Sequence, residues 1–110
     1  MRDHDYWVYI VTNKTGSTLY IGMTNDLKRR VQEHRAGRVK GFTQRYSLSR
    51  LVWYEHFREV RDAIACEKRL KGWLRARKVA LIAEMNPRWV DLTEAWFEEV
   101  VTVEGEEEFL

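Results

Sequence analysis

The stretch WVYIVTNKTGSTLYIGMTNDLKRRVQEH, residues 7–34, contains two short apolar runs followed by a helix-like segment. Residues 7–12 and 18–23 alternate or run apolar, which is typical of β-strands, and the TNKTGST between them is rich in turn residues. Gly16 can take the positive φ that such a connection often needs. The pattern predicts a β-hairpin.

A helix is expected directly after this hairpin. Asn25 or Asp26 would cap it, and Gly37 would end it after about Ala36.

Two charged or titratable residues lie on or beside the apolar stripe of that helix. Leu27 and Val31 form the stripe, and Arg30 and His34 lie next to it, four residues apart. A guanidinium beside a core is costly to leave unpaired, so Arg30 is expected to bind an anion.

Each predicted strand of the hairpin carries a tyrosine, Tyr9 in the first and Tyr20 in the second. With a symmetric four-residue tip at residues 13–16, the two tyrosines would lie directly opposite each other, with their Cβ atoms about 5 Å apart. A bulge at Gly16 would shift this register. Cross-strand tyrosines often only stabilise a sheet, so the pair alone does not indicate a site.

The rest of the chain predicts an α+β fold. LVWYEHF (51–57) is expected to be a third strand and GRVKGFTQRYS (37–47) a basic loop. Helices are expected at about 59–75 and 78–85, the second stopped by Asn86 before Pro87, with a further short helix within WVDLTEAWFEEV (89–100).

Size and composition predict one domain. The 110 residues, 45% of them hydrophobic, suffice for a single core over residues 1–97, whereas residues 98–110 form an acidic tail expected to be disordered. One cysteine excludes an internal disulfide, and three scattered histidines lack zinc-ligand spacing. No run is apolar enough to span a membrane or to act as a signal peptide, so a cytoplasmic protein is expected.

The net charge of +2 hides a basic body and an acidic end. The tail holds six of the 17 acidic residues and none of the 19 basic ones, which leaves the body at about +8. The basic residues gather around positions 28–50 and 68–78, with aromatic residues between them. This pattern suits a phosphate backbone, although a merely solvated basic surface would look similar.

One carboxylate falls on the expected inward seam of the 59–75 helix. Glu67 lies among Ala63, Ile64, Cys66, Leu70 and Leu74 at helical spacing. A carboxylate there needs a cation, which either an internal Glu–Arg pair or a divalent metal would supply.

Four motifs in order resemble the GIY-YIG nuclease superfamily. They are the pairing of VYI (8–10) with LYIGMTNDLKRRVQEH (19–34), then KGFTQRY (40–46), EKRLKGW (67–73) and EMNPRWVDL (84–92). The chain is most similar to the small single-domain bacterial branch, itself similar to the N-terminal domain of the excision-repair incision subunit. Trp7 replaces the glycine of GIY, a departure that this branch shares.

The resemblance implies a small three-stranded antiparallel sheet flanked by helices and hydrolysis of DNA phosphodiester bonds with one divalent metal, Mg²⁺ or Mn²⁺. Carried over by position, the catalytic residues are Tyr9, Tyr20, Arg30, His34 and Glu67, with Glu67 as the metal ligand. The family's late asparagine would be Asn86, which is equally explained as a helix end. Tyr9, Tyr20 and His34 all remain candidates for the general base.

DNA is the expected partner, with RNA also open, and the expected processes are DNA repair and recombination. Phosphate contacts are expected from Lys28, Arg29, Lys40, Arg45, Lys68 and Lys71. We expect no second domain that would read base edges, and therefore low sequence specificity. Two alternatives stay open: a catalytically weak or inactive nucleic-acid-binding module, or an interaction module with Trp89, Trp96 and Phe97 as an exposed patch. The sequence does not predict the oligomeric state.

Overall fold

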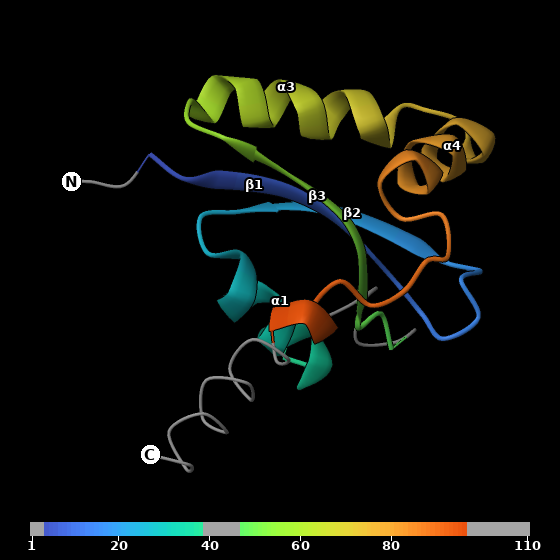
Figure 1. Cartoon of the computed structure of the whole chain (residues 1–110). Coiled ribbons are helices and arrows are strands. Elements are labelled where there is room, and N and C mark those ends of the chain that lie inside the picture. Colours follow the sequence, from blue (N-terminus) through green and yellow to red (C-terminus); the bar gives the residue numbers. More distant parts are fainter. Residues whose placement is uncertain (1–3, 39–46, 97–110) are drawn as a thin grey trace, which may run out of the picture.

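The computed structural model describes residues 4–38 and 47–96 (Figure 1). In chain order the elements are β1 (Tyr6–Thr12), β2 (Leu19–Thr24), α1 (Leu27–Arg35), β3 (Arg50–Phe57), α3 (Val60–Lys71) and α4 (Arg75–Met85). Residues 94–96 are also helical. The rest of the predicted short helix, most of the predicted basic loop and the acidic tail lie outside the described residues.

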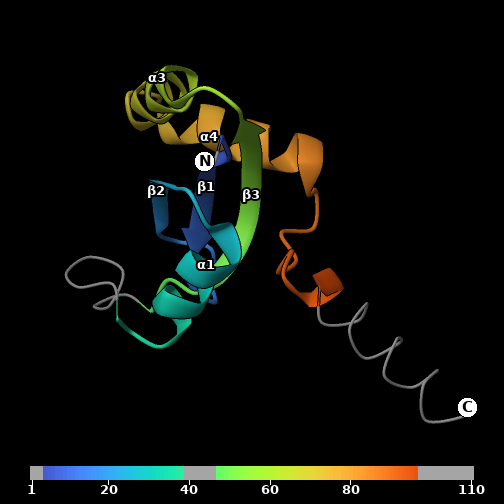
Figure 2. The same cartoon turned by 90° about the vertical axis from the view of Figure 1, so that its left-hand side faces the viewer.

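The three strands form one antiparallel sheet in the order β2-β1-β3, so β1 is central and β2 is an edge strand. Figure 2 shows the sheet with α3 and α4 on one side and α1 on the other. The predicted α+β architecture, a three-stranded antiparallel sheet flanked by helices, is confirmed. None of the helices within the described ranges is long and apolar enough to cross a bilayer.

The hairpin forms as predicted, but its register differs from the expected one. Tyr9 lies opposite Gly22, and Tyr20 lies opposite Val11. The prediction that the two tyrosines oppose each other directly is therefore wrong. The cause is the connection, which runs from residue 13 to residue 18 rather than forming a four-residue tip, with Gly16 at φ 75°. Because the shift is an even number of residues, both tyrosines still lie on the same face of the sheet.

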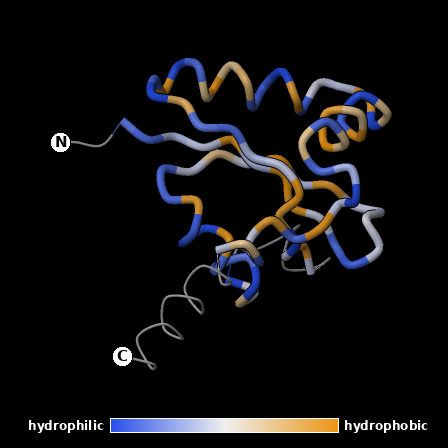
Figure 3. Tube along the Cα trace, in the orientation of Figure 1, coloured by the Kyte–Doolittle hydropathy of each residue, from blue (hydrophilic) through white to orange (hydrophobic). Residues whose placement is uncertain are grey.

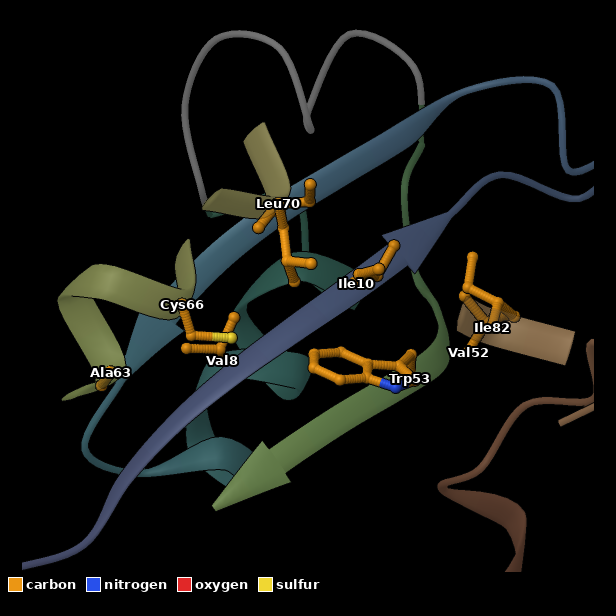
Figure 4. Packing of buried hydrophobic residues seen from close by; sticks show 9 residues of the cluster. Val8, Ile10, Val52, Trp53, Ala63, Cys66, Leu70 and Ile82 are labelled. Atoms are coloured by element: carbon orange, nitrogen blue, oxygen red, sulfur yellow. The ribbon is translucent and has the colours of Figure 1, made fainter. Parts of the chain in front are cut away.

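Two hydrophobic clusters cover the two faces of the sheet. Val8, Ile10 and Ile21 pack against α3 and α4, as Figure 4 shows for Val8 and Ile10 with Cys66, Leu70 and Ile82. Tyr9 and Val11 pack against α1 on the opposite face. The hydropathy colouring of Figure 3 is accordingly orange along the middle of the sheet. The alternation along β1 therefore sends Tyr9 to the α1 face.

Helix α1 begins and ends as the sequence predicts. The carboxylate of Asp26 accepts a hydrogen bond from the backbone N–H of Arg29 at 3.1 Å, which caps the first turn. Gly37 follows the helix at φ 70°, a conformation that glycine takes without strain.

The predicted 59–75 helix is shorter than expected. Helix α3 ends at Lys71, with Gly72 as its C-cap, and α4 already begins at Arg75. The expected inward seam is also narrower. Ala63, Cys66 and Leu70 are buried, but Ile64 is 37% and Leu74 83% exposed. Leu74 caps α4 and so lies outside the periodicity of α3.

Candidate active site

The ring of Tyr9 crosses strand β2 at Gly22. A Cβ atom built on Gly22 would lie 2.5 Å from the Tyr9 hydroxyl and 2.6 Å from Cζ, closer than any side chain tolerates. The missing side chain at Gly22 thus makes the space that the phenol occupies. Gly22 was not expected to have this role, although an isolated glycine inside a strand is a known signal of close approach.

The Tyr9 hydroxyl meets the imidazole of His34 from α1. The hydroxyl and Nε2 lie 3.0 Å apart, and either group can donate in this hydrogen bond, depending on the tautomer. Both side chains are buried. The other ring nitrogen, Nδ1, is buried without a hydrogen-bond partner among the described residues. Among the described residues, the His34 ring is therefore aligned through a single hydrogen bond, the one with Tyr9.

Tyr20 completes a cluster of three rings. Its ring centroid lies 6.3 Å from that of Tyr9 and 5.5 Å from that of His34, both in tilted or edge-on arrangements. Unlike Tyr9, Tyr20 is only half-buried. The cluster thus presents one phenol to the outside and holds a phenol and an imidazole beneath it.

Arg30 is paired with an acidic residue of its own helix. Its Nη1 donates to Glu33 Oε1 at 3.0 Å, and the same carboxylate lies 3.8 Å from Nε of Arg29. Hydrogen bonds with the Tyr9 hydroxyl and with Glu33 raise the pKa of Arg30 above its usual value. The anion expected for Arg30 is therefore Glu33 in the free protein. The spacing of three and four residues on a helix was a signal that could have identified this partner.

The pKa values of the two buried groups, Tyr9 and His34, shift in opposite directions. Burial raises the pKa of Tyr9 to about 12, although the neighbouring Arg30 opposes this shift. Burial and the positive charge of Arg30 lower the pKa of His34 to about 4. At neutral pH, Tyr9 is therefore a protonated phenol and His34 a neutral imidazole. The imidazole is unprotonated and so can accept a proton, but its lowered pKa makes it a weaker base than an ordinary histidine.

Glu67 of α3 approaches the cluster from the opposite face of the sheet. Helix α3 packs against β2, the edge strand that carries Gly22 and Tyr20. The Glu67 carboxylate is 21% exposed, pairs with Lys71 Nζ at 3.1 Å, and contributes to the raised pKa of Tyr9. It is therefore close enough to the phenol to act on it electrostatically. The cation beside Glu67 is a lysine of the same helix, not the arginine of the expected internal pair.

A metal site made only of protein side chains is absent from residues 4–38 and 47–96. No three His, Cys, Asp or Glu side chains gather there around one point. Glu67 is the acidic residue that contributes to the pKa of Tyr9, whereas Glu33 contributes to that of His34. A single carboxylate suits Mg²⁺, which keeps several waters and is commonly completed by substrate phosphates.

The residues predicted to contact phosphates are divided between the two faces of the sheet. Lys28 and Arg29 are exposed on α1, whereas Lys68 is exposed on α3 and Lys71 is held by Glu67. Lys40 and Arg45 lie outside the described residues. Helices α1 and α3 lie on opposite sides of the sheet (Figure 2), so the basic residues that they carry are divided between its two sides.

Asn86 has a structural role in this fold. It is buried, its amide donates to the carbonyls of Val52 at 3.2 Å and Val90 at 2.8 Å, and its oxygen accepts from Val90 N at 3.0 Å. It fixes the chain after α4 to β3 and does not join the ring cluster.

Two of the tryptophans expected to form one patch lie apart. Trp89 packs against the cluster below α3 and α4, and Trp96 packs against the cluster below α1. Phe97 lies outside the described residues. Trp89 and Trp96 therefore do not belong to a single exposed surface.

Comparison with known proteins identifies the family of this chain. The model of the GIY-YIG catalytic domain matches residues 5–80. A UPF0213 protein of Bacillus pumilus is 35% identical over 78% of this chain and 87% of its own, and one of Haloquadratum walsbyi is 37% identical over 76% and 92%. The solution structure of the UPF0213 protein from Bacillus halodurans superposes with a TM-score of 0.53 at 28% identity, covering 82% of this chain and 95% of that one. The chain belongs to the GIY-YIG nuclease superfamily, among its small UPF0213 members.

Proposed function

We propose that this protein is a metal-dependent endonuclease that hydrolyses DNA phosphodiester bonds with low intrinsic sequence specificity. One observation carries the proposal: Tyr9, Tyr20 and His34 form a contiguous cluster at the β2 edge, with Arg30 and Glu67 both acting on the Tyr9 hydroxyl. The proposed catalytic residues are these five.

The proton chemistry follows from the two shifted pKa values. A water that attacks phosphorus must lose a proton, and Tyr9 cannot take it as a phenolate because its pKa lies at about 12. His34 can accept one, since it is neutral, although its lowered pKa makes it a weak base, and its Nε2 is already engaged by the Tyr9 hydroxyl. Tyr9 would therefore receive the water proton on its oxygen while its own hydroxyl proton passes to Nε2 of His34 across the 3.0 Å hydrogen bond. No phenolate is needed at any point.

Arg30 and Tyr20 would bind the phosphate. The guanidinium is permanently charged and presents a planar fork to the non-bridging oxygens, where negative charge grows in the transition state. The bound phosphate would replace Glu33 as the partner of Arg30, because both are anions competing for one fork. Tyr20, the half-exposed phenol, would contact the phosphate or the attacking water.

Glu67 is the residue proposed to hold the divalent metal, Mg²⁺ or Mn²⁺. GIY-YIG nucleases generally use divalent metals, and a bound metal supplies neutralisation of the phosphate charge and of the leaving oxygen. The Glu67 carboxylate would exchange its partner Lys71 for the cation. Lys71 would then be free to contact the nucleic-acid backbone.

Binding is expected to be largely independent of sequence. Lys28, Arg29 and Lys68 would contact phosphates, as would Lys40 and Arg45. Residues 1–97 would form the whole nuclease domain, with residues 98–110 as an acidic tail. Because these contacts do not depend on sequence, we propose that the protein cuts particular DNA structures, in DNA repair or recombination.

The experiment is a cleavage assay with Mg²⁺ or Mn²⁺ on duplex, nicked, flapped and single-stranded DNA. Wild-type protein is expected to cleave at least one substrate, to stop in excess chelator, and to lose activity in Arg30→Ala. If the protein binds all four DNAs but cleaves none with either metal, it is the second candidate, a nucleic-acid-binding module derived from the nuclease fold.

A further inference from the structure

A pocket lies on the same face of the sheet as Tyr9, on the β3 side of α1. Its volume is about 490 Å³, within the range of roughly 300–1,000 Å³ common for small-ligand pockets. Three of its walls are the rings of Trp7 from β1, Tyr54 from β3 and Trp96 near the end of the described chain. None of the proposed catalytic residues lines it. The pocket therefore needs an explanation of its own.

The rings of this pocket do not stack flat on one another. Trp7 and Tyr54 meet at a centroid distance of 5.8 Å and an interplanar angle of 65°, and Tyr54 and Trp96 at 6.4 Å and 57°. All three are half-buried, in contrast to the fully buried Tyr9. The His56 ring centroid lies 4.6 Å from the Trp7 ring centroid and Lys28 lies over the Trp96 ring, while all three aromatic side chains line the pocket. Exposed aromatic faces are what nucleic-acid-binding proteins use to stack unpaired bases.

The charges in the pocket favour a base over a phosphate. Lys28 Nζ lies 5.5 Å from the centre of the Trp96 ring, so one cation stands at the rim. Asp5 and Asp26 also line the pocket, together with His56, whose Nε2 lies 2.6 Å from the Asp5 carboxylate, and one oxygen of Asp26 caps α1. Two carboxylates would repel a phosphate inside, but they can accept hydrogen bonds from the amino groups of a neutral base. The phosphate would stay outside, next to Lys28.

The pocket is continuous with the surface around Arg30. Asn25 lines both this pocket and a neighbouring hollow, which also includes Met23, Arg29 and Arg30. Asn25 precedes α1, and Arg30 lies about one turn into the helix, a rise of about 5 Å. A nucleic-acid strand whose phosphate is bound by Arg30 therefore reaches the aromatic pocket after passing Asn25.

We propose that the pocket formed by Trp7, Tyr54 and Trp96 holds an unpaired nucleobase of the substrate, close to the phosphate bound by Arg30. The inference rests on the proposed function for the presence of a nucleic acid, and it adds the substrate class. Extruding a base is least costly where the base is already unpaired. Single-stranded, bulged or flapped nucleic acid would therefore be preferred over an intact duplex.

The test compares a short oligodeoxycytidylate, whose bases carry amino groups, with an abasic oligonucleotide of the same length and charge. Both are labelled and titrated with full-length Glu67→Gln protein in fluorescence anisotropy measurements. The intact oligonucleotide is expected to bind about tenfold more tightly, because stacking on the three rings is lost with the bases. Equal affinity for the two, together with normal cleavage by wild-type protein, would overturn the pocket but not the proposed function. If neither oligonucleotide binds, both the base-binding pocket and the proposed function are wrong.

A matched pair of variants locates the effect. Tyr54→Phe keeps the ring and should keep the tenfold preference. Tyr54→Thr removes the ring but retains β propensity, and should reduce the preference to about twofold or less. If Tyr54→Thr weakens binding of the intact and abasic oligonucleotides equally, the ring acts on the fold or on phosphate contacts, and the proposal is wrong.

Discussion

The Tyr9 hydroxyl and Nε2 of His34 lie 3.0 Å apart in the space that Gly22 leaves beside strand β2. This contact joins the central strand to α1 and is the one hydrogen bond found for the His34 ring among the described residues. The alignment of the proposed proton path thus depends on the absence of a side chain at residue 22.

Gly22→Ala should reduce cleavage strongly and stability moderately. The new methyl group would collide with the Tyr9 hydroxyl, and a buried ring has little room to move, so we expect a loss of about 1–3 kcal/mol in the free energy of unfolding. The control is Gly72→Ala, where the nearest atoms lie 3.6 Å away and stability should be unchanged or slightly raised. Urea unfolding and cleavage rates check both. Full activity in Gly22→Ala would mean that the position of Tyr9 is unimportant.

The free energy of unfolding should decrease as the pH is lowered, because the pKa of His34 is lower in the folded protein than in the unfolded chain. Its pKa is lowered from 6.5 to about 4 in the folded state, so below about pH 6.5 the unfolded chain binds a proton that the folded protein refuses. Stability is lost progressively as the pH falls from about 6.5 to about 4, by up to roughly 3 kcal/mol. Above this window the contribution is constant.

His34→Gln isolates this effect from the other titrating groups. Urea unfolding at about pH 7.5 and about pH 4.5 should show that the wild type loses roughly 2–3 kcal/mol more than the variant does. Identical losses would show that His34 titrates as an ordinary exposed histidine.

Glu33→Gln should tighten DNA binding. Glu33 pairs with Arg30 at 3.0 Å and approaches Arg29 at 3.8 Å, so it competes with phosphate for both side chains. We expect a gain in affinity of about two- to fivefold at low salt, with stability changed by less than about 1 kcal/mol because the pair is partly exposed. Glu84→Gln on α4 makes the same change of charge elsewhere and should have a smaller effect. An equal gain in DNA affinity in both variants would show that Glu33 acts only through the net charge of the protein and not through its pairing with Arg30.

Asn86→Ala should lower stability without impairing catalysis. It removes three hydrogen bonds and leaves buried backbone groups unpaired, at a cost of about 2–4 kcal/mol. Thermal unfolding measures the loss, and cleavage is compared below the transition of the variant. If Asn86→Ala stays stable but inactive, Asn86 belongs to the catalytic machinery after all.

The strands, α1 and its cap were predictable because period, turn and capping residues are local signals. The hairpin register was not, since the length of the 13–18 connection is set by how Gly16 and its neighbours fold. The end of α3 was missed because EKRLKGWL continues a helical pattern through Gly72, and Leu74 was assigned to a seam that it does not join. The sequence pattern could not predict the raised pKa of Tyr9 or the lowered pKa of His34. Both shifts arise mainly from burial in the folded protein, which the pattern does not quantify.

The most direct test is the cleavage rate of Glu67→Gln under single-turnover conditions with saturating Mg²⁺. The substitution removes one charge and preserves the shape of the side chain, so α3 should fold normally by circular dichroism, and affinity for DNA should be maintained. The proposed role predicts a rate at least about a hundredfold below that of the wild type, because the metal loses its carboxylate. A folded Glu67→Gln protein that cleaves at the wild-type rate would contradict the metal-dependent mechanism.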